Sequence, residues 1–518
     1  MKWKFNLRNS LLAVAVGSLG FTACTDLEEE LLDSSTGEEL LEEIQQGLQD
    51  DPEGTSAQLY LPVYESLRRF VPQDGIYALL EHSTDEMQGP TRGTDWDDGG
   101  VWRVLHTHDW DPNHRMVGAA WNDMNEGVAR AYLALQIFDD AGAGSNVDPF
   151  RAEIRFLRAW FMFYVMDLYG QVPAIDEDSG EAIVLSRAEA YDFITSELED
   201  IVNILPDDNP YPRVDKFAAH ALAAKVYLNA GVYRGDGAFN GDDMDRVISH
   251  ASAVMNSQYD FEGDYFGIFK PENADNSEAL VVFQNFDEID QGVPSGSRVM
   301  MTLHYNMEFG NNYQPWNGFT TIADFYNRWD QDDPRFFQPD DDGDGIAFGF
   351  LQGQQFDGDG NALEDRNGNP LIFTVECPLF GASEPQGVRV IKYSPDNDTP
   401  DAVRMDNDYM LLRYSDVVLM KAEAEFRSGS SDAVNTLNMV RNARGADDLS
   451  SVDEDAILDE RGFELYWEGH RRNDLIRFDR FTDAYTNKDA SAETAKLFPI
   501  PQTALDVNPN LSQNPGYN

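Results

Sequence analysis

Helical periodicity recurs in blocks along both halves of this chain and dictates a fold built from packed helices. In the segment 152–169, apolar side chains return at steps of three and four residues. They are Ile154, Leu157, Trp160, Phe161, Tyr164, Val165 and Leu168. This spacing puts them on one wide stripe of an α-helix, which other helices must cover. The same periodicity is found at 55–70, 117–138, 150–169, 186–205, 215–231, 243–256, 409–428, 432–444 and 453–468.

Several of these blocks resemble tetratricopeptide-like helical hairpins. The stretch AAHALAAKVYLNAGVY at 218–233 places Ala, Leu and Tyr where two helices of a hairpin would touch. The spacing between blocks is too irregular for a strict repeat. We therefore predict a mostly α fold, a tetratricopeptide-like helical-hairpin superhelix whose scaffold covers about 51–256 and 409–518.

The composition changes between about 257 and 408, where Gly, Asp, Asn and aromatic residues dominate. Short runs typical of β-strands occur at 279–283 and 388–393. Loops held on a rigid helical frame often carry function. We predict that this segment is a loop-rich insert with short β-strands, within one domain that spans 51–518.

The N-terminus has the features of a bacterial lipoprotein signal. Three basic residues within the first eight positions precede an apolar run at 11–20, which is too short to span a bilayer. The Phe-Thr-Ala-Cys that follows resembles a lipobox ending at Cys24. Acidic residues come soon after it, a pattern that resembles lipoproteins sent to the outer membrane. We predict a signal peptide over 1–23 and a tether over 24–50 that is lipidated at Cys24.

The charge balance argues against one class of partner. The chain has 93 Asp and Glu against 38 Lys and Arg, a formal net charge of −55. A field of this sign repels phosphate backbones, so we expect no nucleic-acid partner. The second cysteine, Cys377, has no partner once Cys24 is lipidated, so packing of the core must hold the chain together.

Six long stretches carry a resemblance to a known family. In the C-terminal part they are LLRYSDVVLMKAEAEFRSGSSDAVNTLNMVRNARGA at 411–446, DERGFELYWEGHRRNDLIRF at 459–478 and LFPIPQTALDVNPNLSQNPGYN at 497–518. In the first half they are GTDWDDGGVWRVLHTHDWDP at 93–112, AAWNDMNEGVARAY at 119–132 and RFLRAWFMFYVMDLYGQVP at 155–173. Together they closely resemble the SusD (RagB/SusD) family over essentially the whole mature chain.

The resemblance implies a function. Members of that family are lipoproteins on the outer face of the outer membrane, bind glycans, cover a SusC-type TonB-dependent transporter and do no chemistry on the glycan. We therefore expect a lipid-anchored protein, not an enzyme, that captures an oligosaccharide or polysaccharide and delivers it to such a transporter. Two alternatives stay open: a peptide-capturing RagB-like homologue, and a glycoside hydrolase with a carboxylate pair.

The stretch GTDWDDGGVW at 93–102 suits contact with a sugar. Its glycines let the backbone turn sharply, so that Trp96 can project from a loop. An aromatic plane covers the C–H face of a sugar ring, while a carboxylate such as Asp95 accepts hydrogen bonds from the hydroxyls. We predict Trp96 and Asp95 as ligand contacts. Three further tryptophans lie in apolar surroundings and are predicted to be core: Trp102, Trp110 and Trp121.

A second candidate platform lies at 311–326. Tyr313 and Trp316 flank a proline that stiffens the loop, and an Asn-Gly turn signal follows. We predict both aromatic residues as ligand contacts, with the alternative that Trp316 only packs the insert onto the helices. The family layout suggests Asp85 and Arg389 as further polar contacts at the same face.

His470 and Asp474 lie four residues apart and invite a catalytic interpretation. No Ser or Cys accompanies them in the motif, so a nucleophile is missing from the stretch. We predict a structural role, in which the basic residues of the motif pair with the acidic chain. These residues are Arg471, Arg472 and Arg477.

Two acidic stretches resemble the start of a calcium loop. Asp340, Asp342 and Asp344 offer oxygen ligands at alternate positions, and DGDGNALEDRNGN at 357–369 has the same texture. Counting twelve residues from either start does not reach the Glu that an EF-hand requires, so an EF-hand is excluded. A looser structural calcium site at the first stretch is one interpretation, and acidic hairpin turns are the other. We expect no other cofactor.

Overall fold

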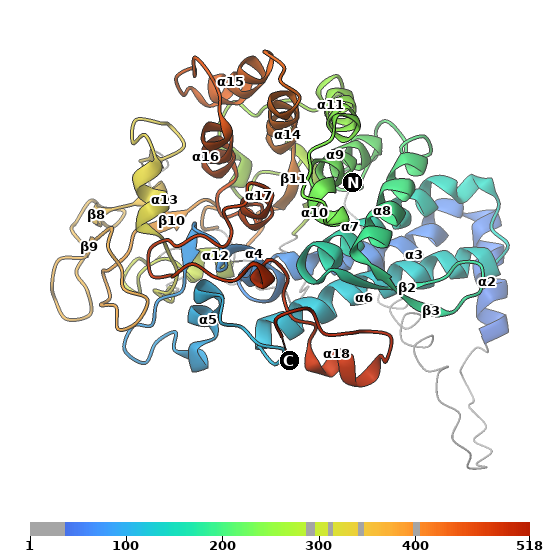
Figure 1. Ribbon diagram of the computed structural model, residues 1–518, viewed down its shortest axis with the longest axis horizontal. Coiled ribbons are helices and arrows are strands. Elements are labelled where there is room, and N and C mark those ends of the chain that lie inside the picture. The colour runs from blue at the N-terminus through green and yellow to red at the C-terminus, as the bar shows by residue number, and fades with distance from the viewer. Residues whose placement is uncertain (1–36, 286–295, 309–313, 340–346, 397–404, 518) are drawn as a thin grey trace, which may run out of the picture.

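Helices form most of the structure, which confirms the predicted class of fold. The computed structural model describes residues 37–285, 296–308, 314–339, 347–396 and 405–517. Figure 1 shows the long helices along one side and across the top of the molecule, with short strands and loops at the opposite end.

The long helices pack in chain order. They are α6 (Arg115–Asp140), α7 (Asp148–Tyr169), α8 (Arg187–Ile201), α9 (Lys216–Leu228), α11 (Gly241–Met255), α14 (Tyr414–Arg427), α15 (Ala433–Arg444) and α16 (Glu454–Leu465). Each of the first five packs on the next, and α14 then packs against α9 and α11 before α15 and α16 follow. The two helical parts of the sequence therefore build one continuous scaffold (Figure 1).

Close approach of two helices depends on one small residue. A Cβ atom on Gly127 of α6 would lie 2.5 Å from the ring of Phe161 on α7. Glycine at this position lets the ring of Phe161 on α7 press against α6. Trp160 is buried, as the periodicity predicts.

Nine further α-helices, most of them shorter, complete the helical part of the described residues. They are α2 (Gly37–Asp50), α3 (Pro52–Glu65), α4 (Gly75–Glu81), α5 (Val101–Thr107), α10 (Ala230–Arg234), α12 (Ser297–Met300), α13 (Ala323–Arg328), α17 (Arg471–Arg477) and α18 (Gln502–Val507). Within the predicted tether over 24–50, residues 37–50 form the helix α2, whose Ile44 and Leu48 are buried against the scaffold, and residues 24–36 lie outside the described part of the chain. Those two residues lie four apart, at helical spacing that the acidic composition of the segment hides.

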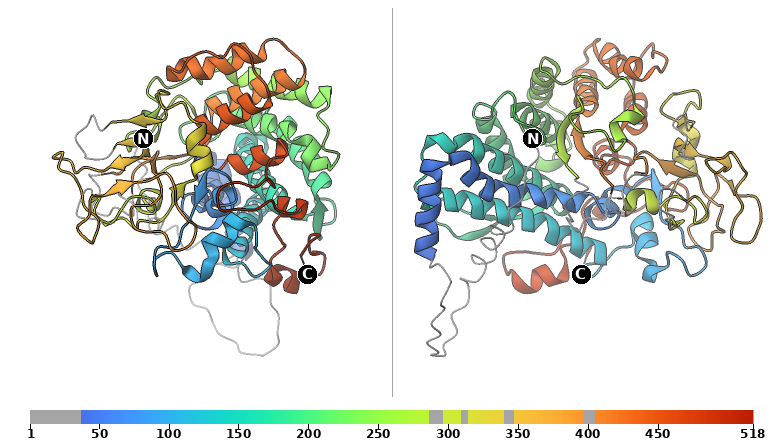
Figure 2. Two further views of the ribbon diagram at one scale, coloured as in Figure 1. Left: turned by 60° about the vertical axis from the view of Figure 1, so that its left-hand side comes forward. Right: turned by 180° about the vertical axis from the view of Figure 1, so that it is seen from behind.

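The strands are short and pair antiparallel, some at the loop-rich end and others against the helices. They are β1 (Met87–Gln88) with β5 (Thr320–Thr321), β2 (Gln171–Ile175) with β3 (Ala182–Ser186), β4 (Ala279–Phe283) with β11 (Tyr409–Arg413), β7 (Phe348–Leu351) with β6 (Phe337–Gln338) and with β10 (Arg389–Ile391), and β8 (Gly353–Gln354) with β9 (Ile372–Phe373). The strands predicted at 279–283 and 388–393 are confirmed. Figure 2 shows most of these strands beside the helical scaffold.

The predicted helix over 409–428 begins later than expected. Residues 409–413 form β11, and the helix starts at Tyr414. Every residue of β11 is buried, and the short apolar run at 409–412 fits a buried strand as well as a helix. The pairing with β4, which is distant in sequence, decides the outcome.

Buried ion pairs tie the C-terminal helices to β11. Arg335, Arg413 and Arg444 all contact the carboxylate of Glu464, which is itself fully buried. Burial opposes the charged form of Glu464, but the three guanidinium groups outweigh it and hold the pKa of the carboxyl well below its usual range. Removing one member of such a network would leave buried charge unpaired, so these contacts fix the arrangement of the elements.

The proline-rich C-terminus wraps back over the helices. The amide of Phe498 donates to the carbonyl of Leu168 at 2.8 Å, and Trp110 Nε1 donates to the hydroxyl of Tyr517 at 2.7 Å. Trp102, Trp110 and Trp121 are all buried, which confirms their predicted place in the core. Among the described residues, no helix combines the length and the hydropathy that crossing a membrane requires.

Candidate functional site

The two predicted aromatic platforms meet in one cluster. Trp96 Nε1 donates a 2.8 Å hydrogen bond to the carbonyl of Trp316, and the two rings lie 6.3 Å apart at 47°. Trp96 also packs against Phe319 and Trp102, with ring centroids 4.6 Å and 5.8 Å apart respectively. Segments that are more than two hundred residues apart in sequence therefore supply one aromatic surface.

Trp96 is half-buried, which corrects the expectation of a freely projecting side chain. Its φ of +60° lies in the left-handed region that bulky residues rarely adopt. Mutual hydrogen bonds between the backbones of Arg92 and Asp95 close the turn before it. A Cβ atom on Gly318 would lie 2.4 Å from the Trp96 ring, so glycine is required beneath the tryptophan. The loop thus holds the ring in a single, slightly strained position.

A polar network borders the aromatic cluster. Asp95 accepts a 2.5 Å hydrogen bond from the hydroxyl of Tyr305 and lies 3.3 Å from Arg366 Nη2. Arg366 Nε donates to Glu384 at 2.7 Å, and His304 Nε2 lies 3.2 Å from the other oxygen of that carboxylate. The Asp95 and Arg366 side chains are 39% and 49% exposed, so both can reach a ligand.

Four members of this network were not identified from the sequence: His304, Tyr305, Arg366 and Glu384. Tyr305 and Arg366 lie 210 and 271 positions from Asp95, and neither belongs to a motif. The guanidinium of Arg366 lies 3.8 Å above the ring of Tyr305, which fixes both side chains. Only the fold brings them to the tryptophans.

The environment sets the protonation of the network. Burial, with the nearby Asp95 carboxylate, raises the pKa of Tyr305 well above its ordinary value. Burial lowers the pKa of His304 to about 4. Burial acts against the charge of Glu384, but hydrogen bonds from Arg366 and His304 outweigh it and lower the pKa of that carboxyl. At neutral pH the cluster is therefore bordered by a protonated phenol, a neutral imidazole and a carboxylate.

Arg389 lies beneath the site and not on it. Its side chain is 0% exposed, so it makes no direct contact with a ligand, which corrects the prediction. Arg389 Nη2 donates to Asn317 Oδ1 at 2.6 Å and to the carbonyl of Glu384 at 2.8 Å. It therefore joins the turn next to Trp316 to the loop that carries Glu384. Buried Arg92 acts in the same way, through the carbonyls of Gly318 and Gln386.

Asp85 is also buried, which corrects its predicted role as a ligand contact. Its carboxylate accepts two hydrogen bonds from Arg471, at 2.7 and 2.9 Å, and lies 3.2 Å from Arg328. The arginines outweigh burial and lower the pKa of Asp85. This residue fastens the segment before β1 to α17, and its burial keeps the carboxylate out of reach of a sugar.

The predicted structural role of the His470 region is confirmed. His470 is buried, and burial lowers its pKa to about 4. Asp474 pairs with Arg461 and Arg477, each at a distance of 2.7–2.8 Å. Arg471, Arg472 and Arg477 pair with Asp85, Asp167 and Glu423 respectively.

Several predicted residues lie outside the described part of the chain. They are Cys24, Tyr313, Asp340, Asp342 and Asp344. Within the described ranges, no group of three or more His, Cys, Asp or Glu side chains is arranged to hold a metal ion.

The second acidic stretch, 357–369, forms two similar turns. Asp357 accepts hydrogen bonds from the amides of Asp359 and Asn361, and Asp365 accepts them from the amides of Asn367 and Asn369. Hydrogen bonds from the side chain and backbone of Asn361 lower the pKa of Asp357, and those from the backbone and side chain of Asn369 lower the pKa of Asp365. The carboxylates serve the hairpin backbone, which is the second of the two interpretations made from the sequence.

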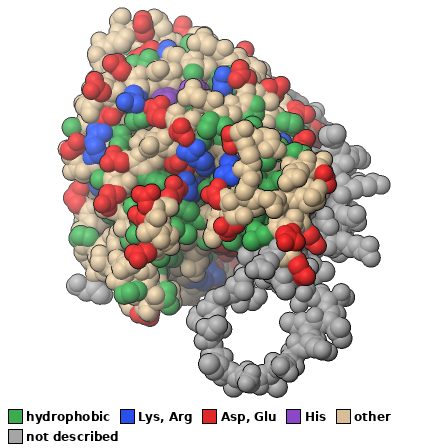
Figure 3. Space-filling view, turned by 90° about the vertical axis from the view of Figure 1, so that its right-hand side faces the viewer, with side chains coloured by type: hydrophobic (Ala, Val, Ile, Leu, Met, Phe, Trp, Pro, Cys, Tyr) green, Lys and Arg blue, Asp and Glu red, His purple; other side chains and the backbone are tan. Residues whose placement is uncertain are grey.

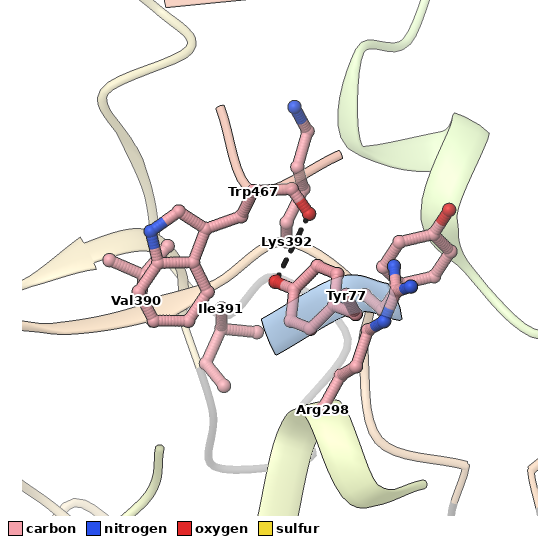
Figure 4. Close-up of a pocket in the computed structure, with 7 residues that line it drawn as sticks. Tyr77, Arg298, Val390, Ile391, Lys392 and Trp467 are labelled. Carbon is pink, nitrogen blue, oxygen red and sulfur yellow. Dashed lines mark hydrogen bonds between the residues drawn. The ribbon is translucent and has the colours of Figure 1, made fainter. Parts of the chain in front are cut away.

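A small internal pocket lies elsewhere, between α4, α12 and β10 (Figure 4). Tyr77, Arg298, Lys392 and Trp467 line it, and the Tyr77 hydroxyl donates to the carbonyl of Trp467 at 3.3 Å. All four side chains are buried, so a sugar chain has no path to them. The half-buried Trp96 and Trp316, with the exposed polar side chains beside them, are therefore the better candidate for ligand binding.

Two family models match the sequence. The model of the SusD family matches residues 380–517, and a model described as "Starch-binding associating with outer membrane" matches residues 77–228. The starch-binding protein SusD of Bacteroides thetaiotaomicron is 29% identical over 409 residues, which are 71% of this chain and 72% of that protein. SusD-like protein P25 of Formosa agariphila is 23% identical over 78% of this chain and 79% of its own length.

Solved structures share the fold. A laminarin-binding SusD-like protein superposes with a TM-score of 0.69 at 22% identity, over 90% of this chain and 99% of that one. Surface glycan-binding protein A from Bacteroides thetaiotaomicron, in complex with laminarihexaose, gives a TM-score of 0.68 at 20% identity, over 89% of this chain and 99% of that one. The helical scaffold and the loop-rich end together are thus the architecture of SusD-like proteins.

Proposed function

Because this chain belongs to the SusD family, we propose that it binds a neutral oligosaccharide or polysaccharide at the cell surface and leaves it chemically unchanged. The observation that carries the proposal is the meeting of Trp96 and Trp316 beside the half-exposed Asp95 and Arg366. Relatives with the names starch-binding and laminarin-binding support the class of ligand.

The chemistry of the cluster matches a sugar ring. A tilted pair of indoles offers apolar area to the C–H groups of a pyranose, and its polar border offers acceptors and donors to the hydroxyls. The site is preorganised, because Phe319 and Gly318 already hold Trp96 in place. Less conformational entropy is therefore lost from the protein when a sugar binds. Stacking and hydrogen bonding hold a sugar without proton transfer or a covalent bond, which supports binding without catalysis.

The charges favour a neutral ligand. The arginines at the cluster and beneath it already have acceptors: Arg366 has Asp95 and Glu384, while the buried Arg92 and Arg389 have backbone carbonyls. An acidic polysaccharide would have to displace those partners against the negative field of the chain.

Affinity gel electrophoresis on a panel of polysaccharides tests the proposal. Starch, laminarin and galactomannan are the neutral probes, and alginate is the anionic one. We expect a neutral polysaccharide to retard the protein and alginate to leave its mobility unchanged. Retardation by alginate alone, or by none of the four, contradicts the proposal.

Two further assays address the alternative functions. A hydrolase would release reducing ends when the purified protein is incubated with the retained polysaccharide, whereas we expect none. A peptide-capturing protein would lose its glycan when peptides compete, whereas we expect peptides to have no effect.

We extend the proposal to location and partner. The lipobox-like Cys24 and the family model that names the outer membrane support a lipid-anchored protein that delivers its glycan to a SusC-type TonB-dependent transporter. Cys24→Ala should release the protein from the membrane, because acyl chains supply the anchoring energy. Cell fractionation without the transporter decides this, and a variant still bound to the membrane would count against it.

Mild detergent should extract the wild type together with the transporter.

A further inference from the structure

Phe380 is exposed to an unusual degree for an aromatic residue. Its relative exposure is 72%, against 50% for Phe356 and 46% for Phe337. Single exposed apolar residues are common on protein surfaces, so exposure alone indicates no function. The surroundings of this ring are what set it apart.

The ring is held from one side by a cation. The guanidinium of Arg103 lies 5.2 Å from the centroid of the Phe380 ring, within the range of a cation–π contact. The same arginine donates to Asp97 Oδ1 at 3.0 Å and bonds the hydroxyl of Thr91. Because Arg103 covers one face, a ligand would stack on the opposite face of the ring.

The backbone that carries Phe380 is fixed on both sides. The amide of Thr91 donates to the carbonyl of Leu379 at 3.0 Å, and the amide of Ala382 donates back to the carbonyl of Thr91 at 3.0 Å. The ring therefore belongs to a segment that is bonded to the loop before Trp96. When a sugar stacks on this ring, the protein loop would therefore lose little conformational entropy.

The same loop joins Phe380 to the aromatic cluster. Thr91 contacts the segment of Phe380, Asp97 accepts from the arginine that covers its ring, and Trp96 lies between them in the chain. Asp97 is 51% exposed, so its carboxylate can also accept from a hydroxyl at the edge of the ring. The elements of the first platform, an aromatic plane and a polar edge, are repeated here.

We propose that Phe380, with Arg103 and Asp97 at its edge, is a second stacking subsite that binds another ring of the same neutral glycan chain. The inference rests on the proposed function and adds to it the length of the ligand. A short oligosaccharide occupies only the cluster of Trp96 and Trp316, and a longer chain reaches Phe380 as well.

The test compares affinity with ligand length. The probes are size-fractionated oligosaccharides, from the disaccharide upward, cut from whichever neutral polysaccharide of the panel retards the wild type. We expect the calorimetric affinity of the wild type to rise again once the chain is long enough to span both platforms. Phe380→Ala should abolish this second rise, a loss of about tenfold, which corresponds to about 1.4 kcal/mol.

Controls separate the subsite from the fold and from the first platform. Phe337→Ala removes an exposed phenylalanine that lies on β6, and it should bind every length as the wild type does. Phe380→Trp keeps an aromatic plane and should keep the second rise. Both variants and Phe380→Ala should melt as the wild type does, because the ring is exposed.

Three results would overturn the inference. Long chains could bind Phe380→Ala as tightly as wild type, which would leave the ring free for a protein partner instead. Short and long chains could lose affinity equally, which would make Phe380 part of the first platform or of the fold. If no neutral polysaccharide retards the wild type, the proposed function itself is contradicted, and the subsite with it.

Discussion

At the scale of single residues, the site depends on side chains that position others. Arg389 has no exposed surface, yet it joins the turn beside Trp316 to the loop that carries Glu384. Resemblance to a family suggested this arginine as a ligand contact, but sequence cannot tell whether a polar residue points outward. Burial resolves that question, and it separates Arg389 and Asp85 from the half-exposed Asp95.

A conservative change tests the polar border. Glu384→Gln keeps the shape of the side chain but removes the charge that Arg366 and His304 contact. Hydrogen bonds to charged groups are worth about 1.5–3 kcal/mol, so glycan binding should weaken by up to that amount as Arg366 loosens. Calorimetric titration of the variant measures the loss, and an unchanged dissociation constant would show that the border does not contribute.

The pH dependence of binding has a defined sign. The pKa of Glu384 in the folded protein lies below its ordinary value of 4.5, so its carboxylate stays charged as the pH falls to that value. The contribution of this carboxylate to glycan binding is lost only as the pH falls through the pKa that Glu384 has in the folded protein, which lies below 4.5. Wild-type affinity should therefore be flat between about pH 7 and pH 5. A decline that already begins near neutrality would point to another group.

At the scale of elements, periodicity predicted most of the helices, because apolar residues at steps of three and four form a stripe that only an α-helix can bury on one side. Helix α7 matches its prediction to within two residues. The strand at 409–413 was not distinguished from the helix after it, since its pairing partner lies far away in sequence. Helix α2 was missed because acidic residues surround its buried Ile44 and Leu48.

Two glycines on α6 provide a matched test of how the scaffold packs. Gly127→Ala would put a methyl group 2.5 Å from the Phe161 ring, so we expect a loss of about 1–3 kcal/mol in the free energy of unfolding. Gly118 on the same helix has no atom within 4 Å of its would-be Cβ, so Gly118→Ala should be neutral or stabilise by up to about 1 kcal/mol. Urea unfolding measures both. Equal effects of the two changes would refute the described contact between α6 and α7.

The candidate site was only partly predictable. Trp96, Asp95 and Trp316 stand out as aromatic and acidic residues in loops that are rich in glycine or proline, and the structure places them together. Tyr305 and Arg366 carry no such local signal, because their role arises from contacts across more than two hundred residues. Long-range assembly of loops on a scaffold is what a single sequence does not display.

At the scale of the whole molecule, negative charge is spread over the surface. Figure 3 shows acidic side chains scattered across one face, with basic side chains between them and no single acidic patch. With 93 acidic against 38 basic residues, the folded chain still repels itself. Added salt screens exposed charges far more than buried pairs such as Arg413 with Glu464.

This charge distribution predicts how stability responds to salt. Raising the ionic strength from about 0.01 M to about 0.15 M shortens the screening length from about 30 Å to about 8 Å, so long-range repulsion falls. We expect the melting temperature to rise over that range, equally with sodium and potassium chloride. A melting temperature that falls instead would mean that exposed ion pairs dominate over repulsion.

The central claim is that the cluster of Trp96 and Trp316 binds the glycan. Trp316 is the better residue to change, since Trp96 is locked between Trp102 and Phe319 and its loss would also disturb the core. Calorimetric titration of wild type and Trp316→Ala with the polysaccharide that retards the wild type tests the claim most directly. We expect Trp316→Ala to weaken binding by about 1–3 kcal/mol while it still unfolds cooperatively. Wild-type affinity in a well-folded Trp316→Ala protein would place the binding site elsewhere and contradict the account.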